Sequence, residues 1–347
     1  MALIDSVSNE LTVARLEASC APRKFFPGNG VAFVWGEACC GQKKSGPQTA
    51  PPLVCSEEMM DLICRMGWSP KIARVPQRFE ASPEGTKLYQ PLCVAATCND
   101  VAKAMTIEAE AGNFPMLIGG DHCLAMGSVL ASAKRYPNLC VVWFDAHADV
   151  NTEDTSPTGN MHGMPLAGLL GLEAMDRAPG FNEGQFKCLK PQDVGYVGLR
   201  DVDEGEYEYI RQLGIKTAYH MPDLKNMGIH MQLKAVLDKI NPNRDRPIHL
   251  SFDVDGMDPI DAPSTGTPVP GGVRFHEAVE MVKELRETGL LVSMDLVEVN
   301  PALGDAKDVD VTVRNARWIL AHALGINSDN ADAVKAATPE PQESVVV

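Results

Sequence analysis

The chain has 347 residues, of which 45% are hydrophobic and 22% charged, and its formal net charge is −15 at pH 7. This composition is typical of a globular protein with a full apolar core. The negative charge argues against nucleic acid and anionic membranes as main partners, because both require basic surfaces, and the sequence holds no apolar run of about 18 residues that would predict a membrane span.

Short apolar segments alternate along the chain with longer amphipathic ones. The predicted strands cover residues 30–35, 72–75, 115–118, 139–144, 194–198, 247–252 and 290–297, and the predicted helices include residues 57–66, 99–111, 127–135, 231–239 and 275–287. Near-continuously apolar strands that alternate with helices form a parallel sheet covered on both faces. We therefore predict an α/β fold with three layers, αβα, around a central and mostly parallel sheet.

The middle of the chain contains no linker rich in Pro or Ser and no abrupt change of composition. We therefore predict one globular domain over residues 30–326, preceded by an N-terminal extension (1–29). Residues 327–347 are polar and include Pro-Glu-Pro, which predicts a disordered tail.

Three side chains able to bind metal follow the predicted strand 139–144, namely Asp145, His147 and Asp149. Their i, i+2, i+4 spacing points all three to one side of an extended backbone. Two carboxylates and an imidazole held together are costly unless a cation joins them, so we predict a divalent metal site. Turn or helix-capping roles explain this triad poorly, because they do not require three polar groups on one strand face.

A second set, Asp253 and Asp255, ends the strand 247–252, and His122 follows the strand 115–118 within Gly-Gly-Asp-His. His122 taken alone is compatible with simple turn chemistry. The carboxyl ends of parallel strands share one edge, however, so we expect all six groups to converge there.

The four negative charges of the carboxylates balance the four positive charges of two divalent cations. This oxygen-rich set with two imidazoles favours Mn²⁺ over Mg²⁺, Co²⁺, Fe²⁺ or Zn²⁺. Two ions about 3.5–4 Å apart can share a water and turn it into hydroxide near neutral pH, which predicts hydrolysis of an unreactive electrophile.

Polar residues in the loop after the triad are candidates for proton transfer and substrate binding. His162, flanked by glycine in a polar loop, is suited to shuttling protons at the rim of a site, although a single loop histidine is more often only solvated. Asn151, Thr158 and Asn160 are able to hydrogen-bond the polar end of a substrate, but are equally common as turn formers.

Four further acidic residues have both a functional and a structural interpretation. Asp201, Asp203 and Glu206 are suited to hold an ammonium group, or simply cap the helix that follows them. Glu277 is able to pair bidentately with a planar guanidinium, or is an exposed glutamate in the first turn of a helix.

The motifs together resemble those of the ureohydrolase superfamily over about residues 30–325. They are Gly119-Gly120-Asp121-His122, Asp145-Ala-His147-Ala-Asp149 and Ser251-Phe-Asp253-Val-Asp255. Within the superfamily the chain resembles the arginases, through Asp149-Val-Asn151-Thr152, Thr158-Gly-Asn160-Met-His162-Gly163, Gly198-Leu-Arg-Asp201-Val-Asp203-Glu-Gly-Glu206, Thr265-Gly-Thr-Pro-Val-Pro-Gly-Gly272 and Glu298-Val-Asn-Pro301. The resemblance implies an arginase-like fold with about eight strands, which makes residues 30–326 the catalytic domain.

The resemblance also implies a role for each motif residue. The ligands of two Mn²⁺ per subunit would be His122, Asp145, His147, Asp149, Asp253 and Asp255, with Asp149 and Asp253 bridging or lying near both ions. A metal-bridging hydroxide would attack the guanidinium carbon of L-arginine to give L-ornithine and urea. The catalytic residues would be Asp149, His162 as proton shuttle and Glu277 as the group that orients the guanidinium. Asn151, Thr158 and Asn160 would contact the α-carboxylate of arginine. Asp203 and Glu206, in the segment that begins at Asp201, would contact its α-amino group.

Other functions remain open at this point. An agmatinase or another guanidino-acid ureohydrolase would share the metal motifs, and a catalytically silent arginase-like binding subunit would share the fold. Arginases usually have Ser where this chain has Thr158, which keeps the hydroxyl group and adds a methyl group. Family members are commonly homotrimers. The N-terminal sequence lacks the pattern of a secretory signal, and the ten cysteines form no disulfide framework, so we expect a cytoplasmic protein.

Overall fold

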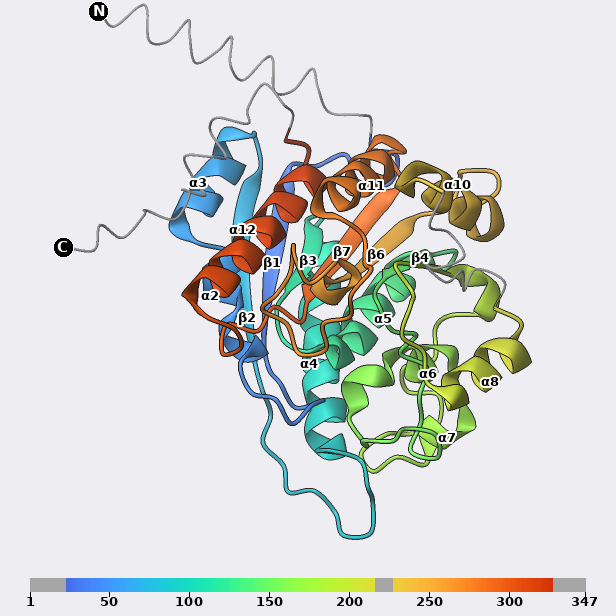
Figure 1. Cartoon of the computed structure of the whole chain (residues 1–347). Coiled ribbons are helices and arrows are strands. Elements are labelled where there is room, and N and C mark those ends of the chain that lie inside the picture. The colour runs from blue at the N-terminus through green and yellow to red at the C-terminus, as the bar shows by residue number, and fades with distance from the viewer. Residues whose placement is uncertain (1–22, 216–226, 327–347) are drawn as a thin grey trace, which may run out of the picture.

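A single parallel sheet forms the centre of the molecule (Figure 1). The computed structural model describes residues 23–215 and 227–326. The strands are β1 (Gly30–Glu37), β2 (Ser69–Pro76), β3 (Phe114–Ile118), β4 (Cys140–Phe144), β5 (Val194–Val197), β6 (Ile248–Asp253) and β7 (Leu291–Val297). Every segment predicted as a strand forms one, in the order β2-β1-β3-β7-β6-β4-β5. The described residues hold seven strands, where about eight were expected, and residues 216–226 lie outside them.

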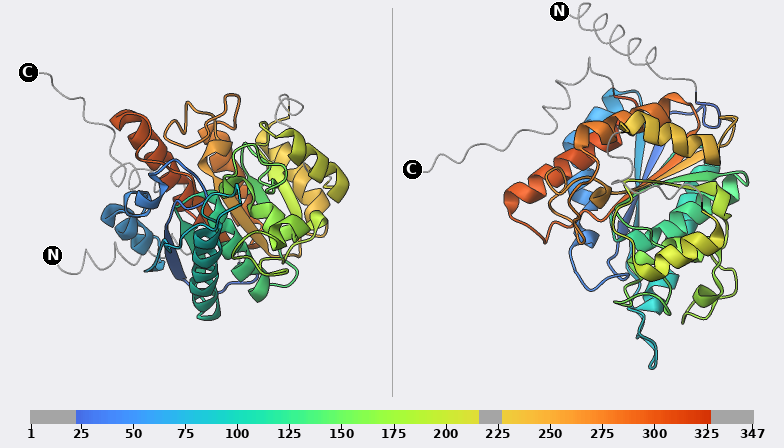
Figure 2. Two further views of the ribbon diagram at one scale, coloured as in Figure 1. Left: turned by 90° about the horizontal axis from the view of Figure 1, so that it is seen from below. Right: turned by 45° about the vertical axis from the view of Figure 1, so that its right-hand side comes forward.

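Helices cover both faces of the sheet, as the three-layer prediction requires (Figures 1 and 2). One face carries α2 (Pro51–Val54), α3 (Glu57–Arg65), α10 (Ile229–Ile240), α11 (Phe275–Glu287) and α12 (Ala306–Ala323). The other carries α4 (Pro91–Glu110), α5 (Ala125–Arg135), α6 (Pro165–Leu170), α7 (Glu173–Asp176) and α8 (Glu204–Leu213). Short 3₁₀ helices are η1 (Pro47–Thr49), η2 (His122–Leu124), η3 (Met161–Gly163), η4 (Pro191–Asp193) and η5 (Val254–Gly256).

The five predicted helices are all present. The helix predicted from Asn99 begins at Pro91, in the first turn, where proline is tolerated because that N–H has no helical partner. The long helix α12 was not predicted, and α8 was expected only as the helix that follows Asp201, Asp203 and Glu206. Both begin with acidic capping boxes, at Asp203 and Asp305.

The side chains of β4 show how the sheet holds its position between two cores. Val141 and Trp143 pack on the face of α4 and α5, whereas Val142 and Phe144 pack on the opposite face, and all four are fully buried. Each such side chain contributes roughly 1.5–3 kcal/mol by leaving water. The centre of the sheet is therefore a well-packed support for the loops that leave its strands.

Four adjacent strands, β3, β7, β6 and β4, bring their carboxyl ends to one edge. The loops that follow them carry His122, the Asp145–Asp149 triad, Asp253 with Asp255, and Glu298. Strand order thus places segments far apart in sequence at one site.

The predicted domain, residues 30–326, lies within the described ranges apart from residues 216–226, and its boundaries stay a prediction. The N-terminal extension is described only from Arg23, and the predicted tail, residues 327–347, lies outside the described residues. In residues 23–215 and 227–326, no helix combines the length and the apolar character needed to cross a bilayer.

Candidate functional site

The backbone after each strand turns sharply and presents polar side chains to the edge. Asp121 caps η2 by accepting a hydrogen bond from the Cys123 amide, and Asp253 caps η5 by accepting one from the Asp255 amide. Asp149 has φ = 53°, a left-handed conformation that costs a non-glycine residue energy and is concentrated at functional sites. Local structure therefore aims these carboxylates inward.

The six predicted metal ligands converge in two overlapping groups. In the first, His122 Nδ1 lies 3.0 Å from Asp145 Oδ2, 2.9 Å from Asp149 Oδ2 and 3.2 Å from Asp253 Oδ2. In the second, His147 Nδ1 lies 3.3 Å from Asp145 Oδ1 and 3.2 Å from Asp255 Oδ2. Asp145 thus offers one oxygen to each group, and the bridging expected of Asp149 and Asp253 stays a prediction.

The donor set fits divalent cations. His122 Nδ1 and Asp149 Oδ2 are buried and form no hydrogen bond of regular geometry, although they lie 2.9 Å apart. Burial, with a contribution from Asp145, raises the pKa of Asp149 to about 7. Burial and the neighbouring carboxylates of Asp255 and Asp145 raise the pKa of Asp253 well above its usual range. Among the described residues no lysine or arginine forms an ion pair with these aspartates, so the groups are suited to bind metal.

A buried hydrogen-bond chain fixes the orientation of His122. Its Nε2 lies 2.8 Å from Ser251 Oγ, which donates a 2.6 Å hydrogen bond to Asp295 Oδ1. His249 and Ser128 donate to the other oxygen of Asp295, at 2.9 and 2.5 Å. The chain leaves Nδ1 of His122 facing the carboxylates, as a metal ligand must. Ser251 and Asp295 are site residues that the sequence analysis assigned no role.

A cleft of about 280 Å³ opens over the two metal groups. Besides Thr267, its lining contains twelve of the predicted site residues. They are His122, His147, Asp149, Asn151, Thr158, Asn160, His162, Asp201, Asp203, Glu206, Asp253 and Asp255. Asn151 Nδ2 donates to Asp203 Oδ2 at 2.8 Å, and its Oδ1 is buried without a partner. The Oδ1 atom of Asn160 is likewise buried and unpartnered. Two amide groups are therefore available for a polar ligand.

Glu206 also lines the cleft, close in sequence to Asp203. It is only 3% exposed, and its carboxylate accepts hydrogen bonds from the backbone amides of Val150 and Asp203, both at 3.0 Å. Burial raises its pKa to about 8. Capping of α8 and a place in the cleft, which the sequence presented as alternatives, are both found.

His162 reaches the cleft from η3 and is paired with Glu298. The distance from His162 Nδ1 to Glu298 Oε1 is 3.0 Å, which leaves Nε2 as the ring nitrogen not engaged by this carboxylate. Burial disfavours the imidazolium, but Glu298 raises the pKa of His162 to about 9. Glu298 is 1% exposed, has φ = 65° and also accepts a 2.9 Å hydrogen bond from the His122 amide.

The structure does not bring Glu277 into the cleft. It lies in the first turn of α11, half-buried, where Oε2 accepts a 2.9 Å hydrogen bond from the Arg274 amide. This is the capping role that was its alternative interpretation. The buried carboxylate beside His162 is instead Glu298, which the sequence analysis quoted without a role. Its position directly after the strand 290–297 was the available signal, because the other site residues also follow strands.

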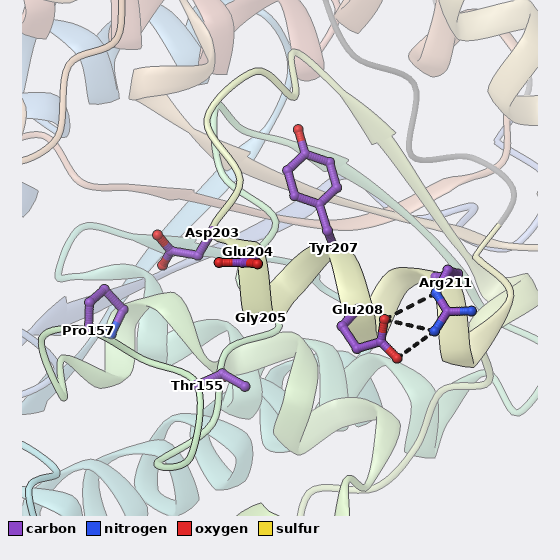
Figure 3. Close-up of a pocket in the computed structure, with 8 residues that line it drawn as sticks. All are labelled: Thr155, Pro157, Asp203, Glu204, Gly205, Tyr207, Glu208 and Arg211. Atoms are coloured by element: carbon purple, nitrogen blue, oxygen red, sulfur yellow. Dashed lines mark hydrogen bonds and ion pairs between the residues drawn. The ribbon is translucent and has the colours of Figure 1, made fainter.

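A second, more open pocket adjoins the cleft along the first turns of α8, and we call it the outer pocket (Figure 3). It shares Pro157 and Asp203 with the cleft. Its other acidic groups are Glu204 and Glu208, and Glu208 binds Arg211 one turn away at 2.6 Å. Figure 3 shows these two side chains facing each other on the surface of α8.

Comparison with known proteins identifies close relatives. The model of the arginase family matches residues 31–325. The chain is 39% identical over 293 residues to an arginase of Glaciozyma antarctica, covering 82% of this chain and 84% of that protein. Its structure is similar to the crystal structure of arginase from Bacillus subtilis (TM-score 0.76, 32% identity, 87% of this chain and 100% of that one). It is also similar to an Entamoeba histolytica arginase in complex with L-ornithine (TM-score 0.74, 30% identity, 86% and 99%).

Proposed function

This chain belongs to the arginase family, and from that premise we propose how its own residues hydrolyse L-arginine to L-ornithine and urea. The protein is an enzyme that cleaves a C–N bond of the guanidinium group. The observation that carries the proposal is the convergence of His122, His147 and four aspartates in two groups that share Asp145, beneath a cleft that also contains His162.

We propose that the cofactor is a pair of Mn²⁺ ions. Asp145 would contribute to both, His122 and Asp149 to one, and His147 and Asp255 to the other, with Asp253 beside His122. Carboxylate oxygens with one imidazole nitrogen per ion suit Mn²⁺. When bound, such ions act as Lewis acids that lower the pKa of water for hydrolysis near neutral pH.

Glu298 and His162 would serve the reacting end of the substrate. We assign to Glu298 the guanidinium contact expected of Glu277, because a buried carboxylate can pair with a planar guanidinium bidentately. His162 Nδ1 is held by Glu298, so Nε2 would carry the proton that the leaving amino group of ornithine requires.

The rim of the cleft would hold the amino-acid end of arginine. Asn151, Thr158 and Asn160 line the cleft and would bind the α-carboxylate through donor groups, namely the side-chain N–H groups of the two asparagines and the hydroxyl of Thr158. Asp203 would bind the α-amino group, with Glu206 fixing the backbone behind it and Asp201 contributing negative charge.

The direct test is urea release from L-arginine and from agmatine by purified protein, before and after Mn²⁺ loading. We expect Mn²⁺-dependent turnover of arginine and at most slow turnover of agmatine, because agmatine lacks the carboxylate. Turnover of agmatine without turnover of arginine would contradict the proposed substrate, and failure to bind two Mn²⁺ per chain would contradict the proposed cofactor.

Two further expectations rest on the resemblance to the family. We propose that the protein is a homotrimer, for which light scattering should give three times the 37.5 kDa chain mass. A cytoplasmic location stays a prediction of the sequence, and imaging of the tagged full-length chain in its host would check it.

A further inference from the structure

One loop is bonded to Asp121, His162 and Glu298, which come from three separate segments around the cleft. Residues 38–46, which we call the Gln42 loop, follow β1 and carry no predicted ligand or substrate contact. The amide of Gly41 donates to Asp121 Oδ2 at 2.7 Å, and its carbonyl accepts from the His162 amide at 3.0 Å. The loop is thus bonded to both the metal-ligand segment and the proposed shuttle segment.

The fit of the loop against the site leaves no room for change at Gly41. A Cβ atom on that residue would lie 2.5 Å from Asp121 Oδ1 and 2.9 Å from the Cβ of Cys123. The two lysines that follow also bind loops of the cleft, because Lys43 Nζ donates to Thr158 O at 3.3 Å and Lys44 Nζ donates to Gly266 O. The position of the backbone at residue 42 is therefore determined from both sides.

The side chain of Gln42 extends from this backbone to Glu298. Gln42 is 2% exposed, and its Nε2 donates to Glu298 Oε2 at 2.7 Å and to Oε1 at 2.9 Å. The same nitrogen lies 3.5 Å from His162 Nδ1. One buried amide therefore touches both oxygens of the carboxylate and the edge of the imidazole that it holds.

We infer that Gln42 is a positioning residue for the hydrolysis. It fixes the plane of the Glu298 carboxylate, and through that plane it sets both the approach of the guanidinium and the direction of the His162 ring. The inference deepens the proposed function and rests on it. A carboxylate that must meet a planar cation has one productive orientation, and a displacement of about 1 Å at a reacting group can cost about 100-fold in rate.

The decisive test is a double-mutant cycle on kcat with Gln42→Met, Glu298→Gln and the double variant. Methionine keeps the length of the side chain and removes the donor. We expect Gln42→Met to lower kcat about 10- to 100-fold with KM changed less than about threefold and the metal content intact. In the Glu298→Gln background the same change should cost less than about twofold, because residues that act through one contact are not additive.

A matched control lies directly after the loop, in η1 (Pro47–Thr49). Gln48 is partly buried, and its side-chain amide bonds to Ser45 Oγ and to the Gly46 amide, at the end of the loop. Gln48→Met should leave kcat within about twofold of wild type. A purely structural role of Gln42 would lower thermal stability but leave kcat unchanged, or would give equal losses in both backgrounds, and either result would overturn the inference.

A second variant keeps the test decisive if Gln42→Met does not fold. Gln42→Glu has the same shape and places a carboxyl group against Glu298, so it should lose more activity than Gln42→Met. Full activity of Gln42→Glu would refute the positioning role. An inactive wild-type protein would instead refute the proposed function, so the two failures are distinguishable.

Discussion

Two acidic regions, one inside the cleft and one in the adjoining outer pocket, differ in burial and in partners. In the inner region, Asp145, Asp149, Asp253 and Asp255 are at most 5% exposed. Among the described residues no lysine or arginine forms an ion pair with any of the four. In the outer pocket, Glu208 is half exposed and paired with Arg211, and Asp203 caps a helix.

The difference shows that residue type alone does not indicate chemistry. Exposed carboxylates are hydrated, and an exposed ion pair is worth about 0–1 kcal/mol. Buried carboxylates without a cation are far more costly, so they persist only where a cation binds. The following substitutions should therefore have large effects in the inner region and small effects in the outer pocket.

The largest effect is expected from Asp253→Ala in the inner region. The change removes an anionic oxygen 3.2 Å from His122 Nδ1 and supplies no replacement. We expect the loss of at least one Mn²⁺ per chain and activity near background, measured by metal analysis and urea release. Asp154→Ala, on the surface beside Arg177, is the control and should keep both ions. Unchanged metal content in Asp253→Ala would mean that this aspartate is not a ligand.

The next largest effect is expected from Glu298→Gln, and Glu277→Gln is its matched control. Neutralising the buried partner of His162 should lower kcat about 100-fold, because charge aimed at the reacting group is lost. Glu277→Gln should change kcat less than about twofold and lower the melting temperature slightly, as the loss of a helix cap does. The reverse ranking would return the guanidinium contact to Glu277.

A moderate effect on metal affinity is expected from Asp295→Asn, which lies one hydrogen bond beyond the inner region. Asp295 accepts from Ser251, which contacts His122. Disturbing such a partner typically weakens metal binding about 10- to 100-fold. Calorimetric titration of metal-free protein with Mn²⁺ would measure the change. Ser132→Ala, which reaches Asp295 only through Ser128 or His249, should alter the affinity less.

The inner region was largely predictable because its signals are local. Asp145, His147 and Asp149 stand at alternating positions directly after an apolar run, and Asp253 and Asp255 repeat the pattern. Strand periodicity also located all seven strands, since buried parallel strands are continuously apolar. A strand and the polar ligands in the few residues after it can be predicted from sequence, because the pattern lies within one short segment.

Long-range partners could not be deduced in this way. Gln42 reaches Glu298 across 256 positions of sequence, and Ser251 reaches Asp295 only because β6 lies beside β7. Glu277 was chosen because a glutamate near the start of a helix fits the chemistry, yet its oxygen caps its own helix. The order of strands decides such pairings, and periodicity does not reveal that order.

A smaller effect should appear in the pH dependence of stability. Glu298 raises the pKa of His162 from 6.5 to about 9, so the folded state binds the proton more tightly than the unfolded chain. The stabilisation is complete below about pH 6.5 and is lost as pH rises through about 9. In EDTA-treated protein, the stability difference between wild type and His162→Asn should shrink by on the order of 1 kcal/mol across this range. Denaturant unfolding at several pH values would measure it, and a constant difference would contradict the ion pair.

The smallest effect is expected in the outer pocket, from Glu208→Gln. The carboxylate is bound to Arg211 on the solvent side of α8, where water screens the pair, so stability should change by less than about 1 kcal/mol. Its charge adds only to the general attraction of a −15 protein for a cationic substrate, so kcat/KM should fall less than about twofold near 0.15 M salt and kcat should not change. Steady-state kinetics at two salt concentrations would test both points. A large loss of kcat would mean that the outer pocket also takes part in catalysis. The burial of a carboxylate would then not distinguish the catalytic carboxylates from the others.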